Sequence, residues 1–281
     1  MTKIIFYTAF ALVCFAFNSI LCRLALKSEE IDAAGFTAAR LISGAAALFI
    51  IFSIFGKKEA AAAKQGNWLS AFFLFAYAIC FSFAYLGLTT ATGALVLFGS
   101  VQATMIVAAL VKGERPGFLE WLGLLVALGG LIYLVFPGLA APPLLSSALM
   151  MAAGVAWGFY TLRGRASQNP LADTNGNFLR SVPMVALASL PFLYQIHLSA
   201  KGILLAVLSG AAASGVGYSV WYAALKYHTA TRAAVLQLSV PALAAAGGVI
   251  FLSETITTRL LLASALILGG IALAIAGRRR K

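Results

Sequence analysis

Charged residues are scarce in this sequence. Only 10% of its 281 residues are charged and 62% are hydrophobic, whereas an ordinary soluble domain is about a quarter charged and about half apolar. A soluble fold of this size would therefore expose large apolar patches to water. The composition excludes a water-soluble globular domain and predicts an integral membrane protein.

Acidic residues, histidines and cysteines are also few, with eight Asp and Glu, two His and three Cys. The carboxylates fall in predicted turns and loops or near the start of a span, so we expect no proton relay at mid-membrane depth. The cysteines are odd in number and lack metal-ligand spacing. We expect no catalytic residue, no metal and no cofactor, and an integral membrane enzyme, which needs a catalytic cluster, is the disfavoured alternative.

The basic residues predict topology rather than a nucleic-acid partner. The net charge is +12, but the Lys and Arg residues lie at the ends of apolar stretches and form no single patch. If the predicted loops alternate across a membrane, one side holds 14 basic residues, including both chain ends, and the other side holds four: Arg23, Lys27, Lys201 and Arg259. The excess predicts that both termini are cytoplasmic, in a bacterial inner membrane.

Long apolar segments recur along the chain. A helix needs about 20 residues to cross the hydrocarbon layer, and helices are expected because a backbone in lipid must satisfy its own hydrogen bonds. Ten segments meet this length: Ile4–Arg23, Ala33–Phe55, Trp68–Leu88, Ala91–Val111, Phe118–Phe136, Leu144–Leu162, Asn175–Tyr194, Gly202–Leu225, Ala230–Leu252 and Arg259–Ala276. The predicted fold is an all-α membrane protein of ten transmembrane helices.

The two halves of the chain resemble each other. At a shift of 140 residues, Arg23 falls on Arg163 and Glu114 on Glu254. We therefore predict two repeats, 1–140 and 141–281, of five helices each. Because five is odd, the second repeat enters the membrane in the opposite orientation. Inverted repeats are typical of secondary transporters that expose a central site to each side in turn.

Short motifs at matching places in both halves suggest a family. The turn Gly113–Pro116 is echoed by Ser253–Thr255, a Gly-Gly helix follows each turn, and the sixth span carries Ala156–Gly158. Over the whole chain this pattern resembles the EamA-type transporters of the drug/metabolite transporter superfamily. In the third span, Ala76–Cys80 also resembles the YddG-type exporters of aromatic and other amino acids. The resemblance implies a carrier of small metabolites.

Aromatic and hydroxyl side chains form two matching stripes. Residues four apart share a helix face, and Tyr77 lies near the predicted midplane, too deep for an interfacial belt. The third-span stripe consists of Tyr77, Phe81 and Tyr85, with Ser82 beside it; the eighth-span stripe consists of Ser214, Tyr218 and Tyr222. Lining of a substrate cavity and packing within the core remain open as alternatives for these residues.

Polar and aromatic residues elsewhere in the spans are further cavity candidates. A mid-span amide is costly unless it bonds to another helix or to a solute. These candidates are Asn18, Phe98, Gln102, Trp157, Tyr160 and Gln237. Each amide is interpreted either as a bond between helices or as part of the cavity lining.

Two arginines lie inside predicted spans, Arg40 and Arg180. An ionisable group there suggests a functional role, and a substrate carboxylate would be a suitable partner. Each residue is also close enough to a predicted helix start for its side chain to extend to the interface. We favour this second, structural interpretation.

A neutral, aromatic and polar cavity suits zwitterionic amino acids, while its rings also accept organic cations. The sequence predicts a secondary transporter that exports small metabolites, in particular aromatic or other neutral amino acids, by alternating access, as a uniporter or exchanger. The alternative within the same fold is an exporter of organic cations, other drugs or nucleosides. The expected partners are a small-molecule substrate and the lipid bilayer, with no nucleic acid. The sequence does not determine the oligomeric state, and we expect a monomer to suffice for transport.

Overall fold

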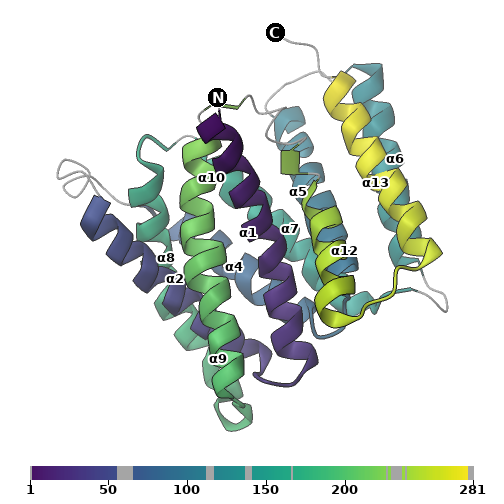
Figure 1. The fold of residues 1–281 in the computed structure, drawn as a ribbon. Helices are drawn as coiled ribbons and strands as arrows, with labels where there is room; N and C mark the ends of the chain where they lie inside the picture. Colours follow the sequence, from purple (N-terminus) through teal and green to yellow (C-terminus); the bar gives the residue numbers. More distant parts are fainter. Residues whose placement is uncertain are drawn as a thin grey trace.

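The computed structural model describes residues 2–55, 66–111, 117–136, 141–165, 167–225, 227–228, 236–237 and 239–277. Helices make up nearly all of this part of the chain (Figure 1). They are α1 (Thr2–Lys27), α2 (Ala33–Phe55), α4 (Trp68–Ala84), α5 (Thr90–Val111), α6 (Phe118–Val135), α7 (Leu144–Gly164), α8 (Pro170–Ser189), the 3₁₀ helix η1 (Leu190–Gln195), α9 (Ala200–Val207), the π-helix η2 (Leu208–Val216), α10 (Gly217–Leu225), α12 (Ser239–Leu252) and α13 (Thr258–Gly277). These elements confirm the all-helical fold class.

Most predicted span boundaries agree with the structure to within about one helical turn. The seventh span is the main correction, because α8 begins at Pro170 instead of Asn175. The Asn169 side chain caps this helix by accepting a hydrogen bond from the Ala172 backbone N–H at 3.3 Å, and proline at the first helical position has no N–H to satisfy. Residues 230–235 and 238 of the predicted ninth span lie outside the described residues.

The predicted eighth span contains an unexpected π-helix. Segments α9, η2 and α10 follow one another without a gap, with the π-helix in the middle. Gly210 in η2 lies against α2 so closely that an added Cβ would be 2.1 Å from the Arg40 carbonyl oxygen. Only glycine permits this approach of the two backbones. π-Helical turns are often found at functional sites.

The two halves of the sequence are interleaved in space. Helix α6 packs on α13, α4 and α5 pack on α7, α2 packs on α8 and η2, and α1 packs on α10 and α12. The close contacts of α6 and α13 run in opposite order, since Leu119 lies near Gly277 while Gly130 lies near Leu266. These two helices, the last of each half, are therefore antiparallel, and Figure 1 shows them together at one edge of the bundle.

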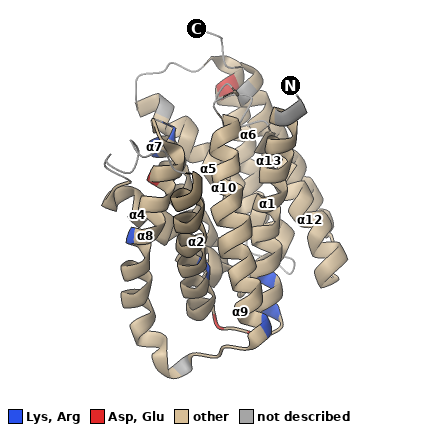
Figure 2. Cartoon of the chain, turned by 60° about the vertical axis from the view of Figure 1, so that its left-hand side comes forward, with Lys and Arg blue, Asp and Glu red and all other residues tan. Residues whose placement is uncertain are grey.

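The outer surface of the bundle is suited to lipid. Five helical stretches are long and apolar enough to cross a membrane: Ile4–Lys27, Ala33–Phe55, Thr90–Ala108, Leu144–Gly164 and Ala200–Leu225. Shorter apolar helices stand beside them, and charged residues gather mainly near helix ends (Figure 2). Helix α1 begins and α13 ends at the same end of the bundle (Figure 1), which we name the termini end; the opposite end is the distal end.

Candidate functional site

A small cavity in the centre of the bundle brings together many of the predicted site residues. Its volume is about 10 Å³, which is room for about one water molecule. The side chains that line it come from α1, α4, α5, α7 and α10: Phe15, Asn18, Tyr77, Phe81, Leu97, Phe98, Trp157 and Tyr218. In this conformation the cavity is too small for a solute the size of an amino acid.

Aromatic rings form most of the cavity wall. The ring centroids of Tyr77 and Trp157 are 4.9 Å apart, and those of Trp157 and Tyr218 are 4.8 Å apart. Phe15 completes the group, with its ring centroid 5.8 Å from that of Tyr218. These separations are those of interacting aromatic pairs. The two predicted stripes therefore meet through Trp157, which comes from a third helix.

Phe15 and Leu97 line the cavity but were not predicted as site residues. Phe15 precedes Asn18 by three positions on α1, so both lie on one helix face. Leu97 directly precedes Phe98 on α5. In both cases the signal that could have found the residue was a predicted cavity residue nearby on the same helix, Asn18 for Phe15 and Phe98 for Leu97.

Arg40 is buried in the centre of the bundle, which contradicts the predicted extension of its side chain to the interface. Only 1% of the residue is exposed. Its Nη2 donates to the Tyr77 hydroxyl at 2.9 Å and to the Tyr218 hydroxyl at 3.3 Å, while Nε and Nη2 both reach Ser214 Oγ at 3.3 Å. The guanidinium carbon also lies 4.9 Å from the ring centroid of Phe81.

The charge of Arg40 is not balanced by a carboxylate among the described residues. It is the only charged residue in the buried part of the described chain. The ion pairs between described residues join other side chains, Arg23 to Glu254 and Lys201 to Glu30. Its Nη1 is buried and has no hydrogen-bond partner in that part of the protein. A buried donor left unpaired costs about 1–3 kcal/mol, and more when it is charged.

Arg180, the repeat counterpart of Arg40, has a different environment. It is half-buried, its Nη1 donates to the Gly176 carbonyl at 2.8 Å, and its guanidinium carbon lies 5.9 Å from the ring centroid of Trp68. The Trp68 residue is 60% exposed at the start of α4. Arg180 therefore lies on the outer part of the bundle and does not line the central cavity.

Asn18 and Ser214 connect the cavity wall to Arg40. Asn18 Oδ1 accepts hydrogen bonds from Ser209 Oγ at 2.8 Å and from Ser214 Oγ at 3.2 Å. Ser214 thus touches both the arginine and the asparagine, and the π-helix contributes both serines. Ser82, which was predicted to lie in the cavity, instead donates to the Ala78 carbonyl of its own helix at 3.0 Å.

Tyr160 and Tyr222 line a second, polar cavity of about 40 Å³ at the termini end. The same cavity is bordered by Arg163, which donates from Nε to Ser70 Oγ at 2.9 Å and from Nη2 to Asn67 Oδ1 at 3.0 Å. The two cavities are linked by adjacent rings, since the centroids of Trp157 and Tyr160 are 5.5 Å apart. The predicted cavity residues are thus divided between two cavities, apart from four that line neither: Ser82, Gln102, Ser214 and Gln237.

The two predicted glutamines are buried, with 3% of Gln102 and 4% of Gln237 exposed. Neither contributes to the wall of the described cavities. Gln102 lies one turn after Phe98 on α5, and its Nε2 is buried without a hydrogen-bond partner in the described part of the chain. It is a second buried donor that is left unsatisfied close to the central site.

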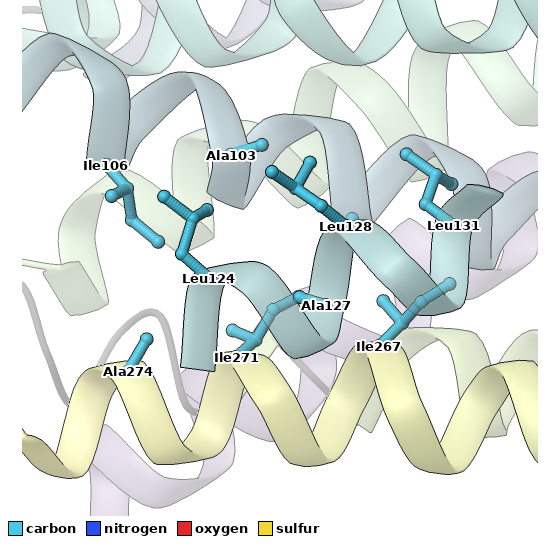
Figure 3. A pocket seen from close by; sticks show the side chains of 10 residues that line it. Ala103, Ile106, Leu124, Ala127, Leu128, Leu131, Ile267, Ile271 and Ala274 are labelled. Carbon is cyan, nitrogen blue, oxygen red and sulfur yellow. The ribbon is translucent and has the colours of Figure 1, made fainter. Parts of the chain in front are cut away.

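A third cavity, between α5, α6 and α13, has a different character. Its volume is about 10 Å³, and only apolar side chains and one glycine line it. Figure 3 shows leucine and isoleucine side chains from α5, α6 and α13, such as Leu124 and Ile267, meeting around it. It offers no group for a polar solute and is a packing gap. No group of three or more His, Cys, Asp or Glu side chains able to hold a metal occurs in the described ranges.

Comparison with known proteins identifies similar sequences over both halves. The sequence model of the EamA-like transporter family matches residues 2–136 and 144–276. An uncharacterised protein of Pseudomonas aeruginosa is 49% identical over 271 residues, which cover 96% of this chain and 94% of that protein. The threonine/homoserine exporter RhtA of Escherichia coli K12 is 32% identical over 166 residues, or 56% of this chain and 54% of the exporter.

A solved structure has the same fold. This crystal structure of another protein aligns with the present chain with a TM-score of 0.67 over 95% of both chains, at 20% sequence identity. At this identity the likeness concerns the fold alone.

Proposed function

Because this chain belongs to the EamA-like transporter family, we propose that it exports aromatic or other neutral amino acids across the membrane through the central cavity. The observation that carries the proposal is the wall of this cavity, where Tyr77, Trp157 and Tyr218 surround a space backed by the buried Arg40. Aromatic walls with a few fixed polar groups are typical of sites for small molecules. The name of the relative RhtA, a threonine/homoserine exporter, supports the same substrate class.

Transport requires that the central cavity open to each side in turn. We propose that the repeats 1–140 and 141–281 are inverted and that movements between them provide this alternation. The antiparallel contact of α6 with α13 supports the inversion. Since each half packs mainly on the other, opening must slide or tilt helices along interfaces between the halves. A monomer contains all the residues that the proposed cycle uses.

The driving force in this proposal is the gradient of the solute, by uniport or exchange. The charged group at the centre of the described chain is a guanidinium, which stays protonated in proteins and cannot relay a proton. We also propose an inner-membrane location with both termini in the cytoplasm, on the basis of 14 basic residues on that side against four on the other. The termini end then faces the cytoplasm and the distal end faces outward.

Counterflow in proteoliposomes tests this function. The purified protein is reconstituted into liposomes that are loaded with unlabelled threonine, homoserine or phenylalanine. Uptake of the same labelled amino acid is then measured with and without a pH gradient. We expect counterflow without a gradient. In Tyr77→Ala we expect the counterflow rate to fall about tenfold or more, because the variant loses the ring that contacts Trp157 and the hydroxyl bound by Arg40. A strict requirement for a proton or sodium gradient would reject the uniport or exchange mechanism.

The panel also contains nucleosides and organic cations, the alternative substrates of the same fold. Counterflow of these compounds with no response to amino acids would reject the proposed substrate class. Gln102→Ala removes a buried donor one turn after the lining residue Phe98 and serves as a second variant, with its effect compared with that of Tyr77→Ala. If both variants fold normally and keep the wild-type rate and selectivity, the central cavity is not the substrate site.

A further inference from the structure

The central site contains a positive charge that the described residues leave uncompensated. A charged side chain at membrane depth is costly and is normally paired with an opposite charge or bonded to backbone carbonyls. Arg40 is instead bonded to three hydroxyls, those of Tyr77, Tyr218 and Ser214. Neutral hydroxyls satisfy hydrogen-bond donors, but they do not neutralise the net charge of a guanidinium.

Two of the unsatisfied groups near the site are nitrogen donors. Arg40 Nη1 and Gln102 Nε2 are both buried without a partner in the part of the chain that the structure describes. Each of these nitrogens carries two hydrogens, so the region can still donate hydrogen bonds to a ligand. A carboxylate, which is negatively charged and only accepts hydrogen bonds, matches this inventory.

The guanidinium lies directly behind the cavity wall. Of the eight lining side chains, Tyr77 and Tyr218 accept its hydrogen bonds and Phe81 lies under it. Ser214 then connects it to Asn18, a fourth lining residue. A solute that entered the cavity would therefore meet groups already oriented by Arg40.

We propose that Arg40 is the specificity-determining residue of the transporter: its guanidinium binds the carboxylate of the substrate, so that carboxylates are accepted and organic cations are rejected. This inference rests on the proposed function and narrows its substrate class. The carboxylate neutralises the buried charge, and the aromatic rings contact the rest of the molecule. A cation without a carboxylate would instead meet a second, uncompensated positive charge, which low dielectric makes strongly unfavourable.

Substrate analogues test the proposal in the wild-type protein without any mutation. The probes are phenylalanine, its amide, phenylethylamine and 3-phenylpropionate, which separate the carboxylate from the amine. Binding is followed by quenching of tryptophan fluorescence in nanodiscs, and transport by competition with phenylalanine counterflow. We expect phenylalanine and 3-phenylpropionate to bind, and the amide and the amine to bind about tenfold to hundredfold more weakly.

Variants at the two repeat-related arginines provide the matched comparison. Arg40→Gln is expected to weaken carboxylate binding by about tenfold to hundredfold and to remove the discrimination between phenylalanine and its amide. Arg40→Lys retains the charge but not the planar fork, so it should retain part of that discrimination. Arg180→Gln is the control and should bind all four probes like the wild type.

The outcomes separate this inference from the proposed function. If 3-phenylpropionate binds through Arg40 but no amino acid is transported, the inference stands and amino acid export is wrong. If phenylalanine is transported and its amide or phenylethylamine competes equally well, export stands and the role of Arg40 is wrong. If no carboxylate probe binds the wild-type protein, the inference is overturned, and this result does not depend on whether Arg40→Gln folds.

Discussion

At the distal end, Arg23 forms an ion pair with Glu254 at 3.6 Å and donates to the Tyr85 carbonyl at 2.7 Å. At the termini end its repeat counterpart, Arg163, bonds to the side chains of Ser70 and Asn67 in the described part of the chain and borders a polar cavity of about 40 Å³. The same position of the repeat is thus held by a charged partner and a backbone group at one end, and by neutral side chains at the other.

Glu254 extends the contacts of the distal end to a third helix. Its carboxylate accepts hydrogen bonds from the Thr90 backbone N–H, at 2.8 and 3.1 Å, and from Thr90 Oγ1 at 3.2 Å. It therefore caps the start of α5 while it pairs with α1, and Lys27 adds a bond from α1 to the Leu252 carbonyl. Among the described residues, Glu254 thus connects α1 and α5 through a charge at the distal end, and we expect this end to be held closed more firmly than the termini end.

The largest expected effect comes from removing the charge at the distal closure. Glu254→Gln leaves Arg23 partly buried without its ionic partner, and breaking such a pair costs roughly 3 kcal/mol. We expect a clear fall in the melting temperature of the purified protein, with a similar fall for Arg23→Gln and little further loss in the double variant. Fully additive losses would show that the two side chains are not coupled.

Cys22 reports directly on whether the distal end has opened. It is fully buried next to Arg23, so it should react slowly with a membrane-impermeant maleimide in nanodiscs once Cys14 and Cys80 are replaced by Ala. Loss of about 3 kcal/mol from the closed state raises the open population about a hundredfold. We expect labelling of Cys22 to accelerate accordingly in Glu254→Gln. An unchanged rate would mean that the ion pair stabilises the fold without holding this end closed.

The equivalent change at the termini end should have a smaller effect. In Arg163→Gln the Ser70 and Asn67 side chains border a polar cavity, where water can replace the lost hydrogen bonds, so the expected cost is about 1 kcal/mol. The same melting assay and the same Cys22 labelling apply. If Arg163→Gln lowers stability as much as Glu254→Gln does, the two ends are equally closed and the comparison is wrong.

The smallest effect concerns a solvent-accessible contact of the distal end and depends on pH. Glu30 accepts a hydrogen bond from Ser199 Oγ at 2.6 Å and pairs with Lys201 Nζ at 3.0 Å. The Ser199 hydrogen bond, followed by the Lys201 contact, lowers the pKa of this carboxyl below its ordinary value of 4.5. Because the folded protein favours the ionised form, the stabilisation is complete above this value and is lost as the pH falls through the lowered pKa.

Glu30→Gln should therefore melt slightly below the wild type at pH 7, and the difference should disappear below pH 4.5 as the wild-type carboxyl becomes protonated. Lys201→Gln is the matched control, with a small effect of the same sign because it removes only one of the two partners. A difference between wild type and Glu30→Gln that grows toward acidic pH would contradict the assignment.

Several parts of the candidate site followed from helix periodicity. A stripe of residues four apart on the third span predicted that Tyr77 and Phe81 share a face, and both line the cavity. Tyr218 followed from the matching stripe on the eighth span and Trp157 from its residue type, and the two rings lie against each other. Periodicity could not assign Tyr160 and Tyr222 to the second cavity, because it specifies a face of a helix but not the helix that covers it.

The repeat also misled the interpretation of its two arginines. Arg40 and Arg180 occupy the same position in the two halves, and sequence reasoning treated them alike. In the structure Arg40 is enclosed by Tyr77, Tyr218 and Ser214, whereas Arg180 lies against the exposed Trp68. The helix position is shared, but the neighbours contributed by the rest of the chain are not.

The sequence by itself determined the solvent and the architecture of this protein. Long apolar segments with few charges require lipid and helices, because backbone groups in hydrocarbon must bond within their own segment, and the repeated motifs indicate a duplicated transporter fold. Only the tertiary structure decided which charge becomes buried. Gly210 brings the π-helix onto the backbone of α2, which places Ser214 within reach of Arg40, and such a contact across 174 residues depends on packing that no local pattern specifies.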